Sequence, residues 1–281
     1  MNDAATPRRI WLCADDYGLA EGVNRAIREL IDRGRLNATS VMVVGSAIGR
    51  DEVKALQEVA AKSPRCAIGL HATLTAPFRP LTMHFRPLDG GMFPGFRTLL
   101  RSAQLRRLDP EIIEAEVAMQ LKTFRDIFGR CADFVDGHQH VQLYPQVRDG
   151  FLAAVKAHAP DAWVRQARRN QPLAQRLNSP KALFLDFLST QFRRRASRAG
   201  IAYNRAFSGA YDYSRTPDYG ALMQQFLDGM AEDGVVMCHP GFVDDVLVGL
   251  DPLTGTREVE HAYLAGEAFP RLLTLNNVTL S

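Results

Sequence analysis

The sequence of 281 residues lacks the features that mark several specialised classes of protein. No hydrophobic run is long enough to span a membrane, and the first residues, MNDAATPRRIWLC, lack the apolar segment of a secretory signal. Neither sign of charge dominates, because 34 Lys and Arg residues stand against 31 Asp and Glu residues. The resulting net charge of +3 is too small to indicate nucleic acid as a partner.

Cysteine is also scarce, and the sequence contains no Cys-x-x-Cys pair. The four cysteines are far apart, and each lies within or beside an apolar run: Cys13, Cys66, Cys131 and Cys238. We therefore expect buried, reduced thiols, which are typical of a reducing compartment. Together with the missing secretory signal, this predicts a cytoplasmic protein.

The chain shows no internal repeat, low-complexity segment or clear linker, and its 46% hydrophobic and 23% charged residues are ordinary for a globular protein. Its length fits one α/β barrel, so we expect a single domain over residues 1–281. Two stretches interrupt the regular pattern, and we interpret both as insertions. Residues 75–108 are rich in Pro, Gly and aromatic residues, which favours a long loop or lid, and residues 167–200 are basic.

Elsewhere, short apolar segments alternate with helical patterns. Strands are predicted at about 8–14 and 38–45, and the apolar residues between them recur at helical spacing over 21–34. Further strands are predicted at 66–74, 132–138, 162–166 and 234–241, with 271–280 closing the sheet, and further helices at 51–62, 109–128, 145–158 and 217–232. This alternation predicts a parallel sheet with right-handed crossovers.

Polar residues gather at the ends of these predicted strands. They are the adjacent acids Asp15 and Asp16 and the histidines His71, His138, His140 and His239. The carboxyl ends of parallel strands meet on one face of the fold, so these side chains are expected to converge in space.

A carboxylate and two imidazoles, with positions left open, suit a catalytic divalent metal ion. A second carboxylate beside the first could act as a general base, and a further histidine as a general acid. A cation would also offset the repulsion between Asp15 and Asp16, which otherwise raises the cost of ionising both.

Each pattern taken alone also has an ordinary structural explanation. Paired aspartates can cap a helix, and His71 can be a hydrogen-bonded core residue. HQH can be two residues on one strand face, and HPG can be a turn. Only the shared placement at strand ends favours a site.

Four segments in order, ADDYGLAEGVNRAI, IGLHATLT, VDGHQHVQLYPQV and MCHPGFVDD, resemble the motifs of the YdjC-like carbohydrate deacetylases. That family includes chitooligosaccharide deacetylases and hopanoid-biosynthesis-associated deacetylases, and the likeness extends from residue 8 to about 245. It implies a (β/α) barrel, distorted from the regular TIM-like form and related to the polysaccharide deacetylases. It also implies a metal-dependent hydrolase that removes acetyl groups from N-acetylated sugars.

The resemblance further implies a role for each matching residue. Asp16, His71 and His138 correspond to the metal ligands, with Zn²⁺ or Mg²⁺ as the leading candidates, and Mn²⁺ or Co²⁺ also compatible with the donor set. Asp15 corresponds to the general base, and His239 to the general acid.

Five other residues belong to the same neighbourhood in the motifs or near them. His140 is expected behind the ligands or beside the substrate rather than on the metal. Asp136 either orients His138, lines the pocket or accepts a hydrogen bond at the strand end. Arg165 is expected at the pocket edge, either behind the site residues or beside the substrate. Arg257 and Glu260 are interpreted as a surface or inter-loop ion pair in preference to pocket residues.

The substrate and the partners stay open at this point. Phe93 and Phe96 either stack on sugar rings or pack in the core. Residues 181–195 form either an ordinary helix with a basic end or a helix resting on a membrane, as a hopanoid-linked glycolipid substrate would require. The resemblance also implies a homodimer as one candidate assembly. Another metal-dependent amidase or esterase on the same barrel is the main rival, whereas a non-catalytic sugar-binding protein would be expected to have lost one of the five matching residues.

Overall fold

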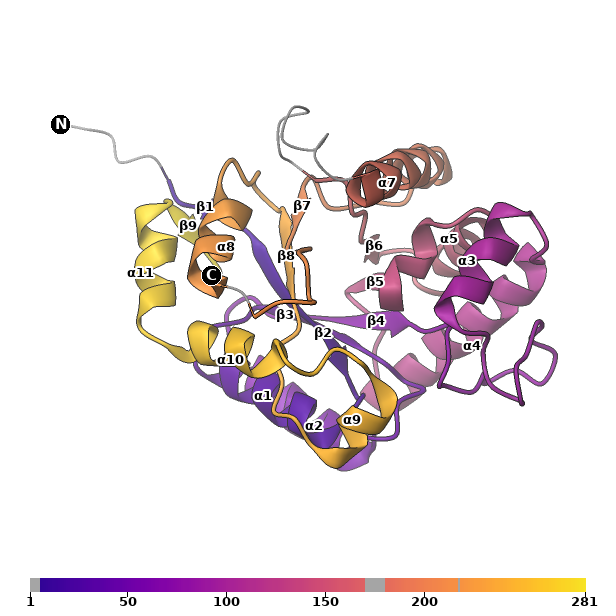
Figure 1. Ribbon diagram of the computed structural model, residues 1–281, viewed down its shortest axis with the longest axis horizontal. Coiled ribbons are helices and arrows are strands. Elements are labelled where there is room, and N and C mark those ends of the chain that lie inside the picture. Colours follow the sequence, from indigo (N-terminus) through magenta and orange to yellow (C-terminus); the bar gives the residue numbers. More distant parts are fainter. Residues whose placement is uncertain (1–5, 170–179, 217) are drawn as a thin grey trace.

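The structure is a computed structural model that describes residues 6–169, 180–216 and 218–281. Its centre is a parallel sheet of seven strands in the order β6-β5-β4-β3-β2-β8-β7. The strands are β2 (Trp11–Tyr17), β3 (Ala38–Val41), β4 (Ala67–Ala72), β5 (Phe134–Gly137), β6 (Trp163–Val164), β7 (Phe207–Ser208) and β8 (Val235–Cys238). Figure 1 shows these strands curling, with helices on the outside.

The two ends of this sheet approach each other without forming a continuous ladder. In the described part of the chain, only isolated parallel bridges connect the region of β6 to the region of β7, namely Val164 with Tyr203 and Arg169 with Phe207. The sheet is therefore a barrel that is open along one side. The expectation of a distorted (β/α) barrel is confirmed.

The main helices follow the strands and cover the outer face of the sheet. They are α1 (Glu21–Asp32), α2 (Arg50–Ala60), α4 (Pro110–Phe128), α5 (Val147–His158), α7 (Pro180–Ala199), α8 (Tyr219–Leu227), α10 (Arg257–Ala265) and α11 (Ala268–Leu275). Shorter helical elements are α3 (Phe96–Gln104), η1 (His138–Leu143) and α9 (Asp245–Leu250). None of the helices in the described ranges has both the length and the apolar character that crossing a bilayer requires.

Local sequence signals explain where the longest outer helix begins and ends. The Asp109 side chain accepts a hydrogen bond from the backbone N–H of Glu111 at 2.9 Å, and Pro110 occupies the first turn, where its missing N–H costs nothing. Gly129 ends α4 with a left-handed φ of 69°. The apolar face of α4 is buried against the sheet and against α5, which is where the core of this side lies.

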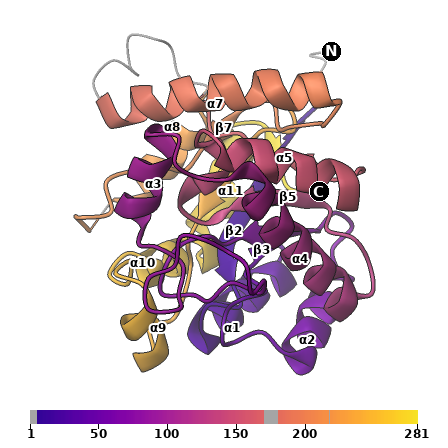
Figure 2. The same ribbon diagram turned by 90° about the vertical axis from the view of Figure 1, so that its right-hand side faces the viewer.

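The two stretches interpreted as insertions contain helices of their own. Residues 75–108 form an irregular loop followed by α3, and residues 167–200 include α7, which lies across one side of the molecule (Figure 2). The predicted helix over 181–195 thus falls inside α7. Residues 170–179 of the second stretch lie outside the described residues.

Two expectations about the fold were wrong. Residues 271–280 do not close the main sheet, because they begin inside α11 and then pair as β9 (Val278–Thr279) with β1 (Arg8–Arg9) in a separate two-stranded sheet. Cys131 is exposed and Cys66 is half-buried, whereas Cys13 and Cys238 are buried in strands. Cys131 lies at the surface after the end of α4, so its apolar neighbours on the helix do not cover it.

Gly22 in α1 lies against the segment that follows β8. A Cβ atom at this position would come within 2.1 Å of the backbone oxygen of Phe242. The backbone N–H of Gly22 donates to Asp244 Oδ2 at 2.8 Å, and its carbonyl accepts from the N–H of Phe242 at 3.2 Å. This close approach fixes the path of the chain just after His239.

We predict that Gly22→Ala lowers the free energy of unfolding by about 1–3 kcal/mol, because the added methyl group must displace backbone. The matched control is Gly249→Ala, since no atom lies within 4 Å of a Cβ built on that helical glycine. The control should change stability by no more than about 0.5 kcal/mol. Urea unfolding of both variants measures the difference, and equal midpoints would contradict the prediction.

Candidate active site

A bulge at the end of β2 places both adjacent aspartates at the same edge of the sheet. Ala14 pairs with Thr39 and Tyr17 pairs with Val41, so two residues of β2, Asp15 and Asp16, stand opposite one residue of β3. Asp16 has a left-handed φ of 71°, which breaks the normal alternation of side chains along a strand. As a result both carboxylates are buried at the site, 2% and 1% exposed.

Asp16, His71 and His138 come together as a group of three potential ligands. Asp16 Oδ1 lies 3.4 Å from His71 Nε2 and 3.1 Å from His138 Nδ1, and the three donor atoms lie within 4.8 Å of one another. They come from the ends of β2 and β4 and from the residue that follows β5. One carboxylate oxygen and two imidazole nitrogens fit a divalent transition-metal ion.

The orientation of His71 is fixed from behind. Its Nδ1 lies 3.0 Å from Ser40 Oγ and 2.5 Å from Asp136 Oδ1, which leaves Nε2 facing Asp16. A carboxylate behind a ligating histidine is the usual way to set its tautomer. Burial alone would lower the pKa of His71, but Asp136 and Asp15 together raise it to about 10.

Asp136 therefore contacts His71, not His138 as one expectation had it. The register between β4 and β5 places His71 directly beside Asp136, so the two side chains share a face of the sheet. His138 comes two residues after Asp136, beyond the end of β5, and approaches Asp16 from the first turn of η1.

Arg165 forms a buried ion pair with the first aspartate. Its two terminal nitrogens lie 2.6 Å from Asp15 Oδ1 and 2.6 Å from Asp15 Oδ2, and Nη1 also lies 3.1 Å from Asp136 Oδ2. Burial acts to raise the pKa of Asp15, but Arg165 and then His71 outweigh it and hold the pKa well below its usual value. Arg165 is fully buried beneath the site, so it does not lie at the pocket edge, and its contact with Asp15 fits the alternative position behind the site residues.

Arg257 and Glu260 are both 0% exposed, so the interpretation as a surface ion pair was wrong. Arg257 Nη2 donates to Asp16 Oδ2 at 2.7 Å and to Asp251 Oδ2 at 2.6 Å. Burial acts to raise the pKa of Asp16, but Arg257 and His138 hold it well below its usual value. Glu260 instead accepts a hydrogen bond from the backbone of His239.

His239 lies near Asp15 and is not part of the three-donor group. Its Nε2 is 4.0 Å from Asp15 Oδ2, and its Nδ1 is 3.4 Å from the hydroxyl oxygen of Tyr213. The backbone N–H of His239 donates to Glu260 Oε2 at 2.6 Å. The imidazole is thus positioned at one edge of the site, while 13% of its side chain stays exposed.

His140 lies outside the three-donor group. Gln139 and His140 both have left-handed backbone, with φ of 56° and 57°, and the His140 ring contacts the edge of Phe207 at a centroid distance of 5.6 Å. Burial, followed by Arg165, lowers the pKa of His140 to about 3, so the ring is neutral.

The two aromatic residues considered for sugar stacking differ in access. Phe93 is fully buried and packs edge-on against Phe85 at 4.8 Å, so of its two alternatives core packing holds and stacking on a sugar does not. Phe96 is half-buried, 6.1 Å from the ring of Tyr144. The ring of Phe78 lies beside the three-donor group, 6.2 Å from the ring of His138.

Sequence reasoning missed two residues that contact the site. Ser40 lies inside a predicted strand, whereas the candidate residues come from the ends of predicted strands. Tyr213 follows β7, a strand of two residues with no pattern long enough to predict. A shorter window for strands would have brought the segment after residue 208 into consideration.

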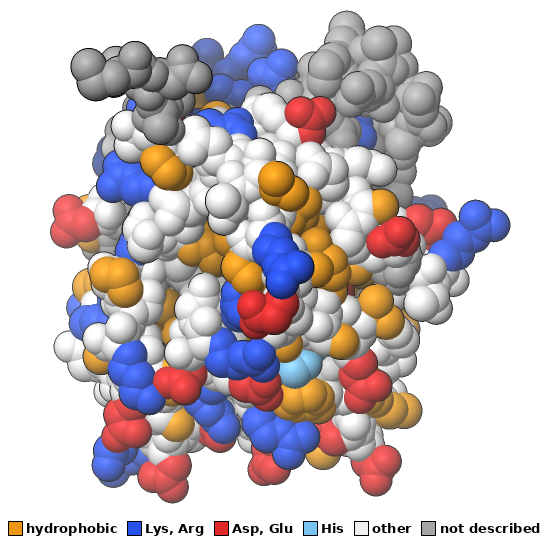
Figure 3. Space-filling view, turned by 90° about the vertical axis from the view of Figure 1, so that its left-hand side faces the viewer, with side chains coloured by type: hydrophobic (Ala, Val, Ile, Leu, Met, Phe, Trp, Pro, Cys, Tyr) orange, Lys and Arg blue, Asp and Glu red, His pale blue; other side chains and the backbone are white. Residues whose placement is uncertain are grey.

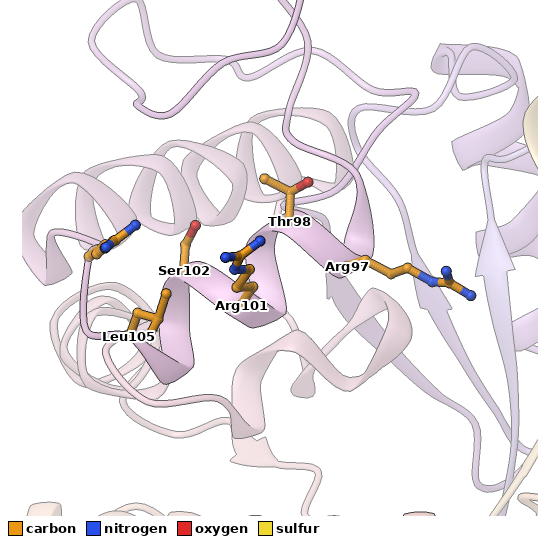
Figure 4. A pocket seen from close by; sticks show the side chains of 6 residues that line it. Arg97, Thr98, Arg101, Ser102 and Leu105 are labelled. Atoms are coloured by element: carbon orange, nitrogen blue, oxygen red, sulfur yellow. The ribbon is translucent and has the colours of Figure 1, made fainter.

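Three other features do not form a second candidate site. Cys13, Asp15 and Asp136 also lie within 4.8 Å of one another, but the Arg165 guanidinium contacts both of these carboxylates and takes the place that a cation would occupy. A surface hollow of about 450 Å³ over α3 contains no carboxylate or imidazole, and Arg97 points away from Arg101 there (Figure 4). The face shown in Figure 3 mixes acidic and basic side chains, as the balanced composition predicts.

The protein is thus an open α/β barrel with two acids and three histidines at the ends of its strands. The chain belongs to the family of YdjC-like proteins, whose model matches residues 9–274. A chitooligosaccharide deacetylase from Citrobacter koseri is 28% identical over 238 residues, which cover 83% of this chain and 82% of the relative.

Two solved structures resemble the fold. A candidate cellobiose-phosphate cleavage protein from Enterococcus faecalis matches with a TM-score of 0.77 and 19% identity, covering 98% of this chain and 97% of the other. A lactam utilization protein from Thermus thermophilus matches with a TM-score of 0.52 and 16% identity, covering 97% and 98%. At 19% and 16% identity, these two similarities show a shared fold alone.

The buried pair of Arg165 with Asp15 leads to a stability prediction. Arg165→Met should lower the free energy of unfolding by about 3–5 kcal/mol, because two buried carboxylates lose their cation. The matched control is Arg130→Met. Arg130 also forms a bidentate ion pair, with Asp133, but the side chains of Arg130 and Asp133 are 39% and 38% exposed. The control substitution should lower the free energy of unfolding by at most about 1 kcal/mol. Chemical unfolding of both variants measures the two free energies, and an equal loss of stability in both would contradict the prediction.

Proposed function

We propose that this protein is a metal-dependent hydrolase that removes the acetyl group from an N-acetylated amino sugar and releases acetate and a free amine. One observation carries the proposal: the ligand set of Asp16, His71 and His138 adjoins an ionised carboxylate, Asp15, with His239 4.0 Å beyond it. Metal ligands, base and acid are then in adjacent positions. The similarity to a chitooligosaccharide deacetylase supports the sugar substrate.

The donors fit a divalent ion by their chemistry and by their orientation. His71 Nδ1 is engaged by Ser40 and Asp136, so Nε2 remains to bind a cation together with Asp16 Oδ1 and a nitrogen of His138. Two imidazoles favour Zn²⁺ over Mg²⁺, which prefers oxygen ligands alone. A bound ion would polarise the acetyl carbonyl and lower the pKa of water.

Asp15 would take the proton from the attacking water. Arg165 occupies one lone pair on each of its oxygens, and a carboxylate oxygen has a second lone pair to accept a further hydrogen bond. Because its pKa is held low, Asp15 stays ionised at neutral pH. His239 would then donate a proton from Nε2 to the leaving nitrogen as the C–N bond breaks.

Acetate release from a panel of substrates tests the proposal. The panel contains N-acetylglucosamine oligomers, an N-acetylglucosaminyl glycolipid and simple amides and esters, each with and without chelator. Chelator-sensitive release from a sugar supports the proposal, and preference for the glycolipid would favour a lipid-linked substrate. Activity only on non-sugar amides or esters would contradict the proposal and favour a metal-dependent amidase or esterase with another substrate.

We predict that Asp15→Asn lowers kcat by about 10²- to 10⁴-fold, the usual contribution of a general base. Metal content should stay near that of the parent protein, because Asp15 is not among the three ligands. Steady-state kinetics and metal analysis on the same preparation provide the measurement. Retained turnover would remove Asp15 from the mechanism.

His71→Ala should lose bound metal, since one of three ligands is gone. His158→Ala serves as the control, because that histidine is exposed at the end of α5. Metal stoichiometry after dialysis against trace Zn²⁺ separates the two variants. The same stoichiometry in both would argue against ligation by His71.

A further inference from the structure

We propose that helix α10 positions both halves of the candidate active site, with Arg257 holding the metal-binding carboxylate and Glu260 holding the backbone of His239. This inference rests on the proposed function. Both are positioning residues, because each acts through another side chain or through backbone.

The two residues lie three positions apart on one helix, so they project from the same face. Both are fully buried, although charged side chains seldom are unless they find partners. Helix α10 contacts both α1 and α8, and Figure 1 shows it on the side of the sheet where β2 and β8 lie. It can therefore reach the ends of both strands.

Arg257 determines which oxygen of Asp16 faces the two histidines. Its Nη2 donates to Asp16 Oδ2 at 2.7 Å, and Nε donates to the carbonyl oxygen of Leu253 at 2.7 Å. Asp251 Oδ2 accepts from the same Nη2 at 2.6 Å. With Oδ2 engaged, Oδ1 is the oxygen that remains for a cation, and free rotation of the carboxylate is prevented.

Glu260 determines where the chain leaves β8. Glu260 Oε2 accepts from the backbone N–H of His239 at 2.6 Å and from the Tyr219 hydroxyl at 3.2 Å. Glu260 Oε1 accepts from the Tyr211 hydroxyl at 2.6 Å. Three donors on one buried carboxylate fix its position, and through it the backbone that sets the imidazole 4.0 Å from Asp15.

A purely structural role would lower stability in all variants alike, whereas the proposal predicts two separable defects. Loss of Arg257 should weaken metal binding, even though it removes a positive charge near the cation. Loss of Glu260 should lower kcat while metal affinity and KM stay unchanged. Glu258 supplies the control on the same helix, because it is exposed and accepts a long, 3.3 Å hydrogen bond from the N–H of Val243.

The first arm measures Zn²⁺ affinity of the full chain by competition with a chromogenic chelator. R257M should bind about 10- to 100-fold more weakly, the usual effect of losing a partner behind a ligand, with R257K in between. E258Q should bind as the parent does. Parental affinity in R257M and R257K, or a higher affinity in R257M, would overturn the inference.

The second arm measures steady-state kinetics on the substrate found by acetate release. E260A should lose about 10²-fold in kcat, as small displacements of catalytic groups do, with KM unchanged. E260Q, nearly isosteric, should recover part of the loss because its amide oxygen can accept from His239. A kcat of E260A equal to that of E258Q, or no recovery in a folded E260Q, would overturn the inference.

D16N separates failure of the inference from failure of the proposed function. If D16N binds Zn²⁺ as tightly as the parent, the ligand assignment itself fails. If D16N loses Zn²⁺ while R257M keeps it, only the role of α10 fails. Thermal unfolding of each variant shows that the comparison is between folded proteins.

Discussion

The structure depends on the burial of two adjacent carboxylates, each of which needs its own cation. Arg165 pairs with Asp15, and Arg257 pairs with Asp16. The two pairs differ in one respect that decides the chemistry. Arg165 engages both oxygens of Asp15, whereas Arg257 engages only one oxygen of Asp16. Only Asp16 therefore keeps an oxygen facing the two histidines, whereas both oxygens of Asp15 are held by Arg165.

The same interactions require the sheet to curl. Arg165 follows β6 and Asp15 belongs to β2, four strand positions away in the order β6-β5-β4-β3-β2. In a flat sheet that separation is about 19 Å at ~4.8 Å per strand. The guanidinium nevertheless lies 2.6 Å from the carboxylate, so the ion pair spans the barrel interior. Where the ladder between β6 and β7 is incomplete, this buried pair helps to hold the open barrel together.

How much of this could be predicted from the sequence follows from the range of the interactions involved. The alternating pattern is local, so the parallel sheet and the strand-end positions of Asp16, His71 and His239 could be predicted. Arg165 and Arg257 could not be placed, because a long side chain gives no local sign of which distant carboxylate it meets. For the same reason the sequence left two alternatives open for Phe93, and the prediction for segment 271–280 was wrong. Tertiary packing decides whether an aromatic ring is buried and which strand an edge segment joins.

The strength of the Asp15–Arg165 pair also bears on why a metal ion belongs in the proposed mechanism. A carboxylate whose pKa is held far below its usual value is a weak base, and proton transfer to a weak base from ordinary water is unfavourable. A divalent ion at Asp16 would remove this difficulty, because it acidifies water. In the proposed mechanism, the burial of Asp15 against Arg165 and the free oxygen of Asp16 would thus be complementary. The first would keep a weak base ionised until it accepts a proton, and the second would supply the metal ligand that makes a weak base sufficient.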